Sequence, residues 1–562
     1  MMPRSLCATL LRPRTRGIAP LDRKNLPQVL ISPPSSTSGI VEPSPGRGVR
    51  WPRWRDPRYG RSFASSTEAE RPPIHHTSAP APDLPPNFLF DLRSAIPGMP
   101  ISTNRYDLDT HGKGESYHPS VPPRAVLSPR STDEVAEIVK RCAADGVPVI
   151  PYGSGTSLEG HVAAVRGGVC LDLTSLDEIR LPADGPPEDA HVQVGAGVTR
   201  RALNQALRHT GLQFMVDPGA DATLGGMAAC GASGTAAVKY GTMRENVLGM
   251  EVVLPDGTAA KCGTDAIKSS AGYDLTSLMI GSEGTLGVIT EVTVRLHPVP
   301  NHIVAAVCSF GGLHGAAEAV AAMRMCGVDL ERCELLDGAS IGAFNAWRSG
   351  RGGDSEFLDG GTGSTMEEKP TLFLEFTGPS QAAVDEHVAM ARSICADDCY
   401  GGSEFKFTDT EEERKRLWSA RHSLYYATLA LRPGASGAVV TDACTPLSKF
   451  ADLITATAED VKKYNVVGPC FGHAGDGNFH CILPLLESDP QDYIDRVHKV
   501  NENLIEKTIA VGGTCTGEHG VGYGKIKYLW KQYGKGGVEF MRLIKRGVDP
   551  RNIMNPEKVV YV

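Results

Sequence analysis

The residues best suited to chemistry in this chain are two histidines on either side of a tight glycine turn. His473 and His480 flank residues 475–477 in a stretch that reads Cys-Phe-Gly-His-Ala-Gly-Asp-Gly-Asn-Phe-His. Residues seven apart on one straight strand point to opposite faces, but a reversal at the turn can bring both imidazoles to one point. Imidazole is the commonest transition-metal ligand in proteins, so the pair predicts half of a metal site.

A carboxylate further along the chain can complete this site. Glu518 lies in the sequence Gly-Glu-His-Gly, where the flanking glycines allow backbone and ligand to approach closely. We therefore predict a divalent cation, zinc or manganese, bound by His473, His480 and Glu518, because both metals accept two imidazoles and a carboxylate. The alternative is a buried turn with two hydrogen-bonded histidines and no metal.

Length and composition are those of a multidomain enzyme. With 562 residues the chain is too long for one hydrophobic core, so two or three domains are expected. Its 14 cysteines lack CxxC pairs and regular spacing, which predicts reduced thiols rather than a disulfide framework or a zinc ribbon. The net charge is −8 and the body has no basic stripe, which argues against a nucleic-acid partner. Because no long apolar run occurs, no membrane-spanning helix is predicted.

The N-terminal segment differs from the rest in charge. Residues 1–63 contain twelve Lys or Arg and three acids, interleaved with Leu and Ile. This composition is typical of an organelle transit peptide, and residues 61–65 resemble a mitochondrial processing pattern. We therefore predict import into the mitochondrion, to the matrix or the inner membrane. A basic arm with no targeting role is the alternative. Residues 64–120 are predicted to begin as a Pro-rich linker and to carry a short helix at 88–96.

Three glycine-rich segments stand out before residue 300. They are residues 151–160, 217–226 and 281–290, and each adjoins a predicted strand. Successive small residues in the first can turn several backbone N–H groups toward an anion such as a pyrophosphate. A Rossmann fingerprint is the competitor, but Leu158 stands where its third glycine should be, and no GxxxxGK[ST] motif occurs. Together the segments predict one extended cofactor that is contacted from several sides.

The apolar pattern around these segments alternates between strand and helix periods. In the first half it predicts strands at 147–150, 193–197, 247–254, 258–262 and 291–296, and helices at 131–144 and 199–207. In the second half it predicts strands at 304–310, 371–376 and 439–446, helices at 313–325 and 411–426, and a surface loop at 350–369. Ser131 and Glu134 are predicted to form a capping box at the first helix. The later alternation predicts a ferredoxin-like cap over the cofactor.

Taken together, the glycine-rich segments resemble the FAD-binding domain of the vanillyl-alcohol-oxidase (PCMH-type) flavoprotein superfamily. The later half resembles the FAD-linked oxidase C-terminal family in Trp418 and Arg421, Asp442 to Pro446, and residues 472–480, 517–520 and 555–556. The resemblance implies an α+β fold with a PCMH-type FAD-binding domain at 121–300. An α/β ferredoxin-like cap with the metal site is expected at 301–525. A C-terminal helical segment at 526–562 is expected to return to the flavin domain.

The resemblance also implies how FAD is bound. The first glycine-rich segment is expected to bind the pyrophosphate, and the other two to line the ribityl chain and the ring. The FAD is expected to be noncovalent, because no histidine stands at the first-domain position where some members attach it. The residues expected to contact it are Pro151, Gly153, Ser154, Gly155, Thr156, Ser157, Gly160, Pro218, Gly219, Thr223, Gly225, Gly226, Ser233, Gly234, Thr235, Gly241, Glu283, Gly284, Gly287, Val288, Ile289 and Asn555.

With the targeting signal, the resemblance is closest to the D-lactate branch of that family. It implies FAD-dependent oxidation of D-lactate, a small 2-hydroxy acid, to pyruvate by hydride transfer to flavin N5. A cation at the predicted metal site can stabilise the alkoxide that develops as the hydroxyl proton leaves. The chain has no Fe–S spacing or haem motif, so the reduced flavin needs an external acceptor. The resemblance implies cytochrome c or another respiratory carrier, and peripheral attachment to the inner membrane is left open.

Three further polar residues are given roles in this chemistry. His519 follows the predicted carboxylate ligand and is the predicted general base, since imidazole titrates near neutral pH. Arg421 is the predicted clamp for the substrate carboxylate, with a helix-surface ion pair as its alternative. Asn478 is expected either to bond the substrate or to stabilise the hairpin. Asp476 is interpreted as a turn-forming residue.

Other functions remain open at this point. A D-2-hydroxyglutarate dehydrogenase has the same fold and chemistry, but a second carboxylate needs a second cation. In that enzyme a lysine stands just before the motif at Asp442, where this chain has Val440 and Thr441, which favours a small monocarboxylate. A flavin-dependent ether-lipid (alkylglycerone phosphate) synthase, with no net redox change, is the next alternative. A non-enzymatic flavin-binding or metal-storage protein is the last.

Overall fold

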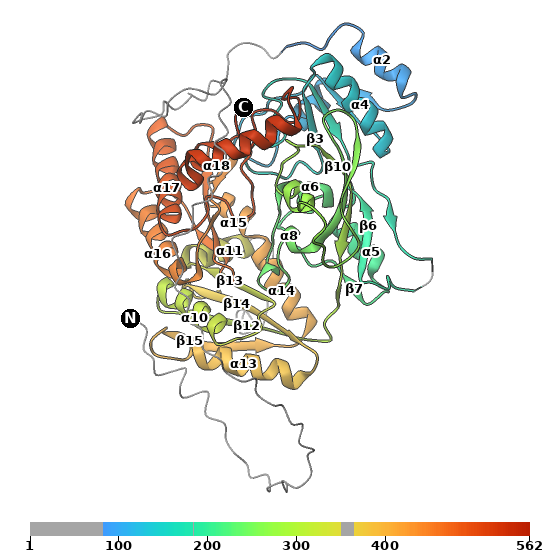
Figure 1. Cartoon of the computed structure of the whole chain (residues 1–562). Helices are drawn as coiled ribbons and strands as arrows, with labels where there is room; N and C mark the ends of the chain where they lie inside the picture. Colours follow the sequence, from blue (N-terminus) through green and yellow to red (C-terminus); the bar gives the residue numbers. More distant parts are fainter. Residues whose placement is uncertain (1–81, 184, 350–364) are drawn as a thin grey trace, which may run out of the picture. The chain divides into compact units, whose positions relative to one another are not determined.

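The computed structural model describes residues 82–183, 185–349 and 365–562 of the chain (Figure 1). The predicted transit peptide, the first part of the predicted linker and most of the predicted surface loop at 350–369 lie outside the described residues. Residues Ala79–Val562 form one compact unit. The predicted short helix at 88–96 is present as α2 (Phe88–Ala95).

The first half is built on two sheets. In one, β2, β4 and β3 are parallel and β1 is antiparallel to β2, in the order β1 (Ile101–Ser102), β2 (Ala125–Leu127), β4 (Val169–Asp172), β3 (Val149–Tyr152). The other is antiparallel, in the order β5 (Ile179–Arg180), β6 (His191–Gly195), β10 (Val288–Arg295), β8 (Val247–Val253), β9 (Ala259–Gly263). The loops that leave these strands are the glycine-rich segments.

Helix α4 (Thr132–Asp145) differs from its prediction at the N-terminus. Ser131 caps it, because its side chain accepts a hydrogen bond from the backbone N–H of Glu134 at 3.2 Å. The reciprocal half of the predicted capping box is absent. The Glu134 carboxylate instead accepts the backbone N–H of Arg130 at 2.7 Å and the Arg130 guanidinium at 3.1 Å.

The second half is organised by one eight-stranded sheet. Its order is β15 (Gly402–Thr408), β12 (His302–Phe310), β14 (Thr371–Gly378), β13 (Arg332–Leu336), β18 (Cys470–His473), β19 (Asn478–Leu485), β16 (Gly437–Val440), with β17 (Ala443–Cys444) also paired to β19. Every pairing in this sheet is antiparallel. We refer to it below as the cap sheet.

The cap sheet has two buried faces because its side chains alternate along each strand. On β12, Ala306 and Cys308 belong to a core with the helices on the outer face, which are α10 (Leu313–Met325), α13 (Gln381–Cys395), α16 (Leu447–Lys463) and α17 (Gln491–Ala510). Ala305 and Val307 belong to the other core, on the inner face, with α11 (Gly338–Ser349), α14 (Glu411–His422) and α15 (Leu424–Ala430). The inner face carries the candidate site.

The single helix predicted at 411–426 is wrong. The structure has two helices, α14 and α15, which meet at Ser423. The Ser423 hydroxyl donates a hydrogen bond to the carbonyl of Ser419 at 2.9 Å, and such back-bonding bends helices. The break lets Leu417 and Leu424 enter the same inner core.

The single strand predicted at 439–446 is also interrupted, between β16 and β17. At the gap, the Thr441 side chain replaces the backbone as the acceptor for the N–H of Cys481, at 2.7 Å. The carbonyl of Thr441 is thereby left to accept a hydrogen bond from Nδ1 of His480, at 3.0 Å. The interruption of the strand therefore orients a candidate metal ligand.

The C-terminal segment contains helix α18 (Ile526–Val548), which is kinked at Gly534. Beyond it, the backbone N–H of Asn555 donates to the carbonyl of Val149 at 2.8 Å, and Met554 forms a parallel bridge with Val149. The tail thus contacts the first half beside β3. Among the described residues, no helix combines the length and hydropathy needed to cross a bilayer.

Candidate active site

A cavity of about 630 Å³ separates the glycine-rich loops from the inner face of the cap sheet. Most of the residues predicted to contact the cofactor line it. They are Pro151, Gly153, Ser154, Gly155, Thr156, Ser157, Pro218, Gly219, Thr223, Gly225, Gly226, Ser233, Thr235, Glu283, Gly284, Gly287, Ile289 and Asn555. The three segments therefore meet at one cavity, although they are far apart in the sequence.

The cavity wall has features that suit a bound dinucleotide. A Cβ atom on Gly153 would collide with Thr223, and one on Gly225 with Ala196, so these glycines let the loops that line the cavity pack closely against their neighbours. The Ser157 hydroxyl is buried without a hydrogen-bond partner, which suits a donor to a phosphate oxygen. Helix α6 (Leu224–Cys230) begins at Thr223 beside the cavity.

Four of the predicted cofactor contacts lie outside the cavity. A Cβ atom on Gly160 would collide with the ring of Tyr523, and one on Gly234 would lie 2.5 Å from Asp217. Gly241 has the same crowding against Glu245, and Val288 belongs to a hydrophobic core. These positions serve packing within the domain, because neighbouring residues of a glycine-rich loop face different sides.

The two candidate histidine ligands lie on the inner face of the cap sheet. Phe471 on β18 pairs with His480 on β19, and His473 is two residues from Phe471, so both imidazoles share a face. Nε2 of His473 lies 3.3 Å and Nε2 of His480 lies 3.1 Å from Oε1 of Glu518. Ligand atoms of the three residues all lie within 4.8 Å of one another. The structure therefore brings the predicted ligands together at the distances that one cation requires.

Both imidazoles are oriented through Nδ1. Nδ1 of His473 contacts Oε1 of Glu334 at 2.6 Å, and Nδ1 of His480 donates to the carbonyl of Thr441 at 3.0 Å. Each ring therefore presents Nε2 to the site, the arrangement by which neighbouring groups orient metal-binding histidines. Oε2 of Glu518 is buried without a hydrogen-bond partner, so it too is available to a cation.

Glu334 is a residue of the candidate site that the sequence analysis missed. It is fully buried on β13, opposite His473, and its other oxygen contacts Nε of Arg421 at 2.6 Å. Burial raises the pKa of Glu334, but Arg421 and His473 outweigh it and bring that pKa to about 2. The available signal was a charged residue inside an apolar strand, because such a charge is costly unless it is paired.

The electrostatics of the trio favour a cation. Burial lowers the pKa of His473, but Glu334 and Glu518 outweigh it and raise that pKa well above the ordinary value. Burial raises the pKa of Glu518, but His473 and His480 bring it well below the usual range. The carboxylates of Glu334 and Glu518 thus stabilise positive charge at His473, and a divalent cation bound by the trio would meet the same negative surroundings.

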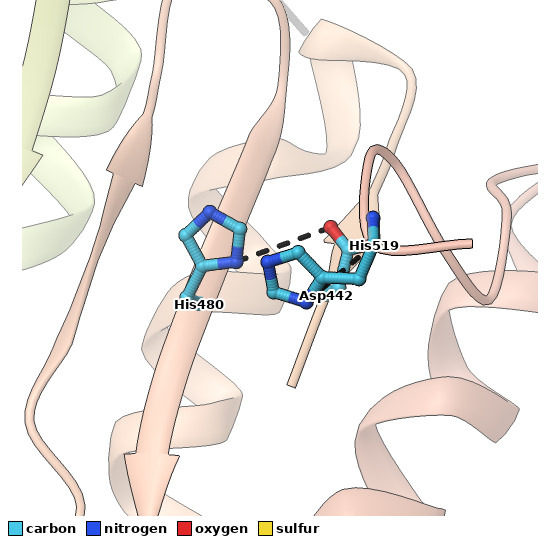
Figure 2. Close-up of side chains that lie close together, drawn as sticks. All are labelled: Asp442, His480 and His519. Atoms are coloured by element: carbon cyan, nitrogen blue, oxygen red, sulfur yellow. Dashed lines mark hydrogen bonds and ion pairs between the residues drawn. The ribbon is translucent and has the colours of Figure 1, made fainter. Parts of the chain in front are cut away.

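A second cluster, formed by Asp442, His480 and His519, also lies within 4.8 Å (Figure 2). Oδ2 of Asp442 already accepts the backbone N–H groups of Gly517, Glu518 and His519 at 2.7 to 2.9 Å, and the Thr516 hydroxyl at 2.6 Å. With its acceptor positions filled, Asp442 positions the loop that carries Glu518 and His519. The first cluster therefore has the ligand atoms that would be more readily available to a cation.

His519, the predicted base, lines the cavity and stacks on His480 with ring centroids 4.9 Å apart. Burial, with the nearby His480 and Lys525, lowers the pKa of His519 to about 4 against the opposing effect of Asp442. The imidazole is therefore neutral near pH 7, as a base must be. Nε2 lies 3.8 Å from Oε1 of Glu518, and Nδ1 lies 4.0 Å from Oδ2 of Asp442.

Arg421 and Asn478 differ in their position relative to the cavity. Arg421 lines the cavity and is buried in an ion pair with Glu334, so its predicted alternative, a pair on the helix surface, does not apply. Asn478 does not line the cavity, and its amide donates to Oδ1 of Asp442 at 2.9 Å. This contact joins the start of β19 to the gap between β16 and β17, and both roles expected for Asn478 stay predictions. The turn role expected for Asp476 is present, since it accepts the backbone N–H of Asn478 at 3.2 Å.

Several other residues of the cavity wall were missed from the sequence. His161 directly follows the first glycine-rich segment, and its Nε2 lies 3.1 Å from Oε2 of Glu283. The first half therefore does place a histidine in the cavity, and the noncovalent binding of FAD stays a prediction. Apolar and aromatic lining comes from Tyr152, Tyr425, Tyr426, Val440, Phe471 and Ile482. These residues carry no motif of their own.

Comparisons with known proteins identify relatives of both halves. Residues 123–263 match a family described as FAD binding domain, and residues 299–559 match one described as FAD linked oxidases, C-terminal domain. A Danio rerio protein named probable D-lactate dehydrogenase, mitochondrial, is 46% identical over 472 residues, which cover 84% of this chain and 90% of that protein. An Arabidopsis thaliana protein named D-lactate dehydrogenase (cytochrome), mitochondrial, is 41% identical over 480 residues, 85% of this chain and 80% of that protein.

A solved structure shares the fold at low identity. A p-cresol methylhydroxylase with substrate bound has a TM-score of 0.67 and 17% identity, and the match covers 84% of this chain and 96% of that one. At this identity the likeness shows the fold alone. With the family matches it confirms the predicted α+β fold, in which a PCMH-type FAD-binding domain precedes an FAD-linked oxidase C-terminal domain.

Proposed function

This chain belongs to the family of FAD-linked oxidases, and from that premise we propose that it oxidises D-lactate to pyruvate in the mitochondrion. Its similarity to these relatives shows that it is an FAD-dependent oxidoreductase. The observation that carries the proposal is the meeting of His473, His480 and Glu518 on the wall that faces the glycine-rich loops, with His519 and Arg421 beside them. This set of groups matches a 2-hydroxy acid, whose hydroxyl and carboxylate need a site for negative charge, a base and a cationic clamp.

Each residue of the site has a distinct role in the proposed reaction. When bound, FAD supplies the acceptor for the C2 hydrogen and its electron pair, and a divalent cation supplies Lewis-acid stabilisation of negative charge. Arg421 binds the substrate carboxylate while Glu334 holds its Nε edge at 2.6 Å. His519 accepts the hydroxyl proton at Nε2, the nitrogen that lies on the Glu518 side of its ring. Asp442 maintains the positions of both Glu518 and His519 through their backbone N–H groups.

The proposed substrate is a small monocarboxylate. Val440, Phe471 and Ile482 form an apolar part of the cavity wall, and Arg421 packs 4.7 Å over the ring of Phe471. A methyl side chain at C2 suits this surface, whereas a second carboxylate would lie unpaired against it at considerable cost. The apolar lining is what supports D-lactate over D-2-hydroxyglutarate.

Cytochrome c, or another respiratory carrier, is the proposed electron acceptor. The Arabidopsis relative is named a cytochrome-type enzyme, and a relative from Saccharomyces cerevisiae has a name of the same type. Two-electron reduction of the flavin must be followed by transfer to an acceptor outside this site. Reduction of added cytochrome c during turnover with D-lactate is the direct measurement.

We expect D-lactate to bleach the flavin under anaerobic conditions, and we expect a chelator to suppress this bleaching. The purified holoenzyme is mixed in turn with D-lactate, L-lactate, D-2-hydroxyglutarate and glycolate, and the flavin absorbance is followed. Fastest bleaching by D-lactate supports the proposal. No bleaching by any of the four acids would overturn it, and unchanged bleaching after complete metal removal would overturn the role of the cation.

Replacing Val440 by Lys is expected to shift preference toward D-2-hydroxyglutarate. The ammonium group would pair with a second carboxylate, and a hydrogen bond between charged groups is worth about 1.5 to 3 kcal/mol, or about 10- to 100-fold in relative kcat/KM. Val440→Met is the matched control, because it has similar length and no charge. An equal shift in both variants would show that side-chain length, and not charge, sets the preference.

A further inference from the structure

Building on the oxidation of a 2-hydroxy acid proposed above, we propose that Glu283 is a positioning residue for hydride transfer to the flavin. Its carboxylate fastens residues 517–522, which we call the metal loop, to the first half of the protein. The metal loop carries both Glu518, a proposed ligand of the cation, and His519, the proposed base. Glu283 thereby sets where these two groups lie relative to the flavin.

Two buried carboxylates, one from each half of the protein, hold the backbone of the metal loop. Oδ2 of Asp442, in the second half, accepts the backbone N–H groups of residues 517–519. Oε1 of Glu283, in the first half, accepts the N–H of Val521 at 2.6 Å, and its Oε2 accepts the N–H of Gly522 at 2.8 Å. Five of the six backbone N–H groups of the metal loop therefore donate to these two side chains. Hydrogen bonds to a charged acceptor are strong, so the course of the loop depends on both carboxylates.

Glu283 belongs to the third glycine-rich segment and lines the flavin cavity, although it is only 5% exposed. Its φ is +54°, in the left-handed region that favours glycine. A residue with a side chain persists in this region only where its surroundings enforce the conformation, and such residues cluster at functional sites. In this conformation the Glu283 carboxylate reaches the metal loop.

Two further residues of the cavity wall hold Glu283 in place. The side-chain amide of Asn555 donates to the carbonyl of Glu283 at 2.7 Å and to the carbonyl of His161 at 3.1 Å. Nε2 of His161 in turn lies 3.1 Å from Oε2 of Glu283. A Cβ atom on Gly520 would lie 2.7 Å from both Oε1 of Glu283 and Nε2 of His161, so the metal loop packs directly against this pair. Glu283 therefore joins the lining of the flavin cavity to the metal loop through close contacts.

The distance over which the hydride moves depends on this junction. In the proposed reaction the second half holds the substrate, through Arg421 and the groups of the metal loop, whereas the glycine-rich segments of the first half hold the flavin. A misplacement of about 1 Å between reacting groups can slow a reaction by about 10²-fold. Glu283 is part of the wall that faces the flavin and accepts hydrogen bonds from the loop that faces the substrate, so it acts on this distance through the metal loop.

A purely structural role for Glu283 predicts a different result from a positioning role. If Glu283 only stabilised the fold, Glu283→Gln would lower the flavin content or the thermal stability, but the flavin that stayed bound would be reduced at the native rate. A positioning role predicts slow reduction of flavin that is fully bound. The amide of Gln keeps one oxygen, so it can accept only one of the two backbone N–H groups that the carboxylate accepts.

Anaerobic stopped-flow reduction of the holoenzyme tests the positioning role. The acid used is whichever of D-lactate, L-lactate, D-2-hydroxyglutarate and glycolate reduces the native flavin fastest. We expect the limiting rate per bound flavin to fall by about 10- to 100-fold in Glu283→Gln. With the acid deuterated at C2, the primary isotope effect should be at least as large as in the native enzyme, because hydride transfer is the step that is slowed. Glu283→Asp, which keeps the charge but withdraws the carboxylate by one methylene, should be slow as well.

Glu331→Gln is the matched control, because Glu331 also joins the two halves. It is 2% exposed in the second half and accepts a hydrogen bond from Tyr240 of the first half at 3.0 Å, but it does not line the cavity. This variant should keep the native rate. A native rate per bound flavin in Glu283→Gln would overturn the proposal. So would a native rate in Glu283→Asp beside a slow one in Glu283→Gln, since charge and not position would then be responsible.

Binding of Mn²⁺ to the flavin-loaded, metal-stripped protein provides a measurement that needs no turnover. Free Mn²⁺ is followed by electron paramagnetic resonance during a titration. We expect the dissociation constant to rise by about 10-fold in Glu283→Gln and to stay unchanged in Glu331→Gln, because residues that orient a metal ligand contribute this much to affinity. If none of the four acids reduced the native flavin, the proposed function would fail, and the Mn²⁺ affinity would decide the role of Glu283 separately. Equal affinity in the native protein and Glu283→Gln would then overturn it.

Discussion

Flavin reduction by D-lactate is expected to slow by about 10³-fold when Glu518 is replaced by Gln, because Lewis-acid stabilisation of developing charge is worth several kcal/mol. The amide keeps the size of the side chain but removes the charge that attracts a divalent cation to His473 and His480, whose Nε2 atoms lie 3.3 and 3.1 Å from it. The measurement is anaerobic stopped-flow reduction, with metal content determined on the same sample by mass spectrometry.

Glu331→Gln is the matched control for this variant. Glu331 is 2% exposed on the same half of the protein, and it accepts hydrogen bonds from Tyr240 at 3.0 Å and Thr377 at 2.5 Å, outside the cavity lining. It should keep both the metal and the rate. A Glu518→Gln enzyme that loses its metal yet reduces its flavin at the native rate would refute the catalytic role of the cation.

Replacing His519 by Ala is expected to slow flavin reduction by about 10²- to 10⁴-fold, the usual contribution of a general base. The pKa of His519 is lowered to about 4, chiefly by burial, so the native imidazole is unprotonated and able to accept the hydroxyl proton. FAD and metal should both remain bound, because His519 is not one of the proposed ligands. That retention separates this variant from Glu518→Gln, whose defect is accompanied by metal loss.

His498→Ala is the control for removing a partly buried imidazole. Partial burial also lowers the pKa of His498, but its ring is tilted against that of Tyr117, with centroids 5.9 Å apart, and it does not line the cavity. Its rate should match that of the native enzyme. If His519→Ala also reduced its flavin at a near-native rate, the base would have to be another group of the cavity wall.

The metal-site hypothesis could be reached from residue types and spacing because a hairpin is a local structure. Two histidines around a glycine turn can meet without help from distant segments, and β18 and β19 do pair across that turn. The glycine-rich segments behave in the same way, since a crowded backbone requires glycine wherever the chain passes close to a neighbour. Both features, with the family resemblance, were enough to predict the fold.

The orientation of the site could not be reached in this way. Glu334 lies 139 residues from His473 in sequence and contacts it only because β13 and β18 are neighbours in the cap sheet. The sequence predicts that Asp442 is part of a strand. In the structure its carboxylate accepts hydrogen bonds from three successive backbone N–H groups of the loop that carries Glu518. Ser423 separates two helices that periodicity joined, because its hydroxyl bonds to the preceding turn.

The sequence by itself determined which residue types are available for chemistry in this protein, because ligand types, glycine positions and their spacing are local properties. Only the tertiary structure decided which carboxylates orient those ligands, which glycines face the cavity and which serve packing, and that the amide of Asn478 bonds to Asp442. The physical reason is that burial and pairing depend on strand order and register. Strand order and register bring Glu334 and His473 into contact, although 139 residues separate them in the sequence.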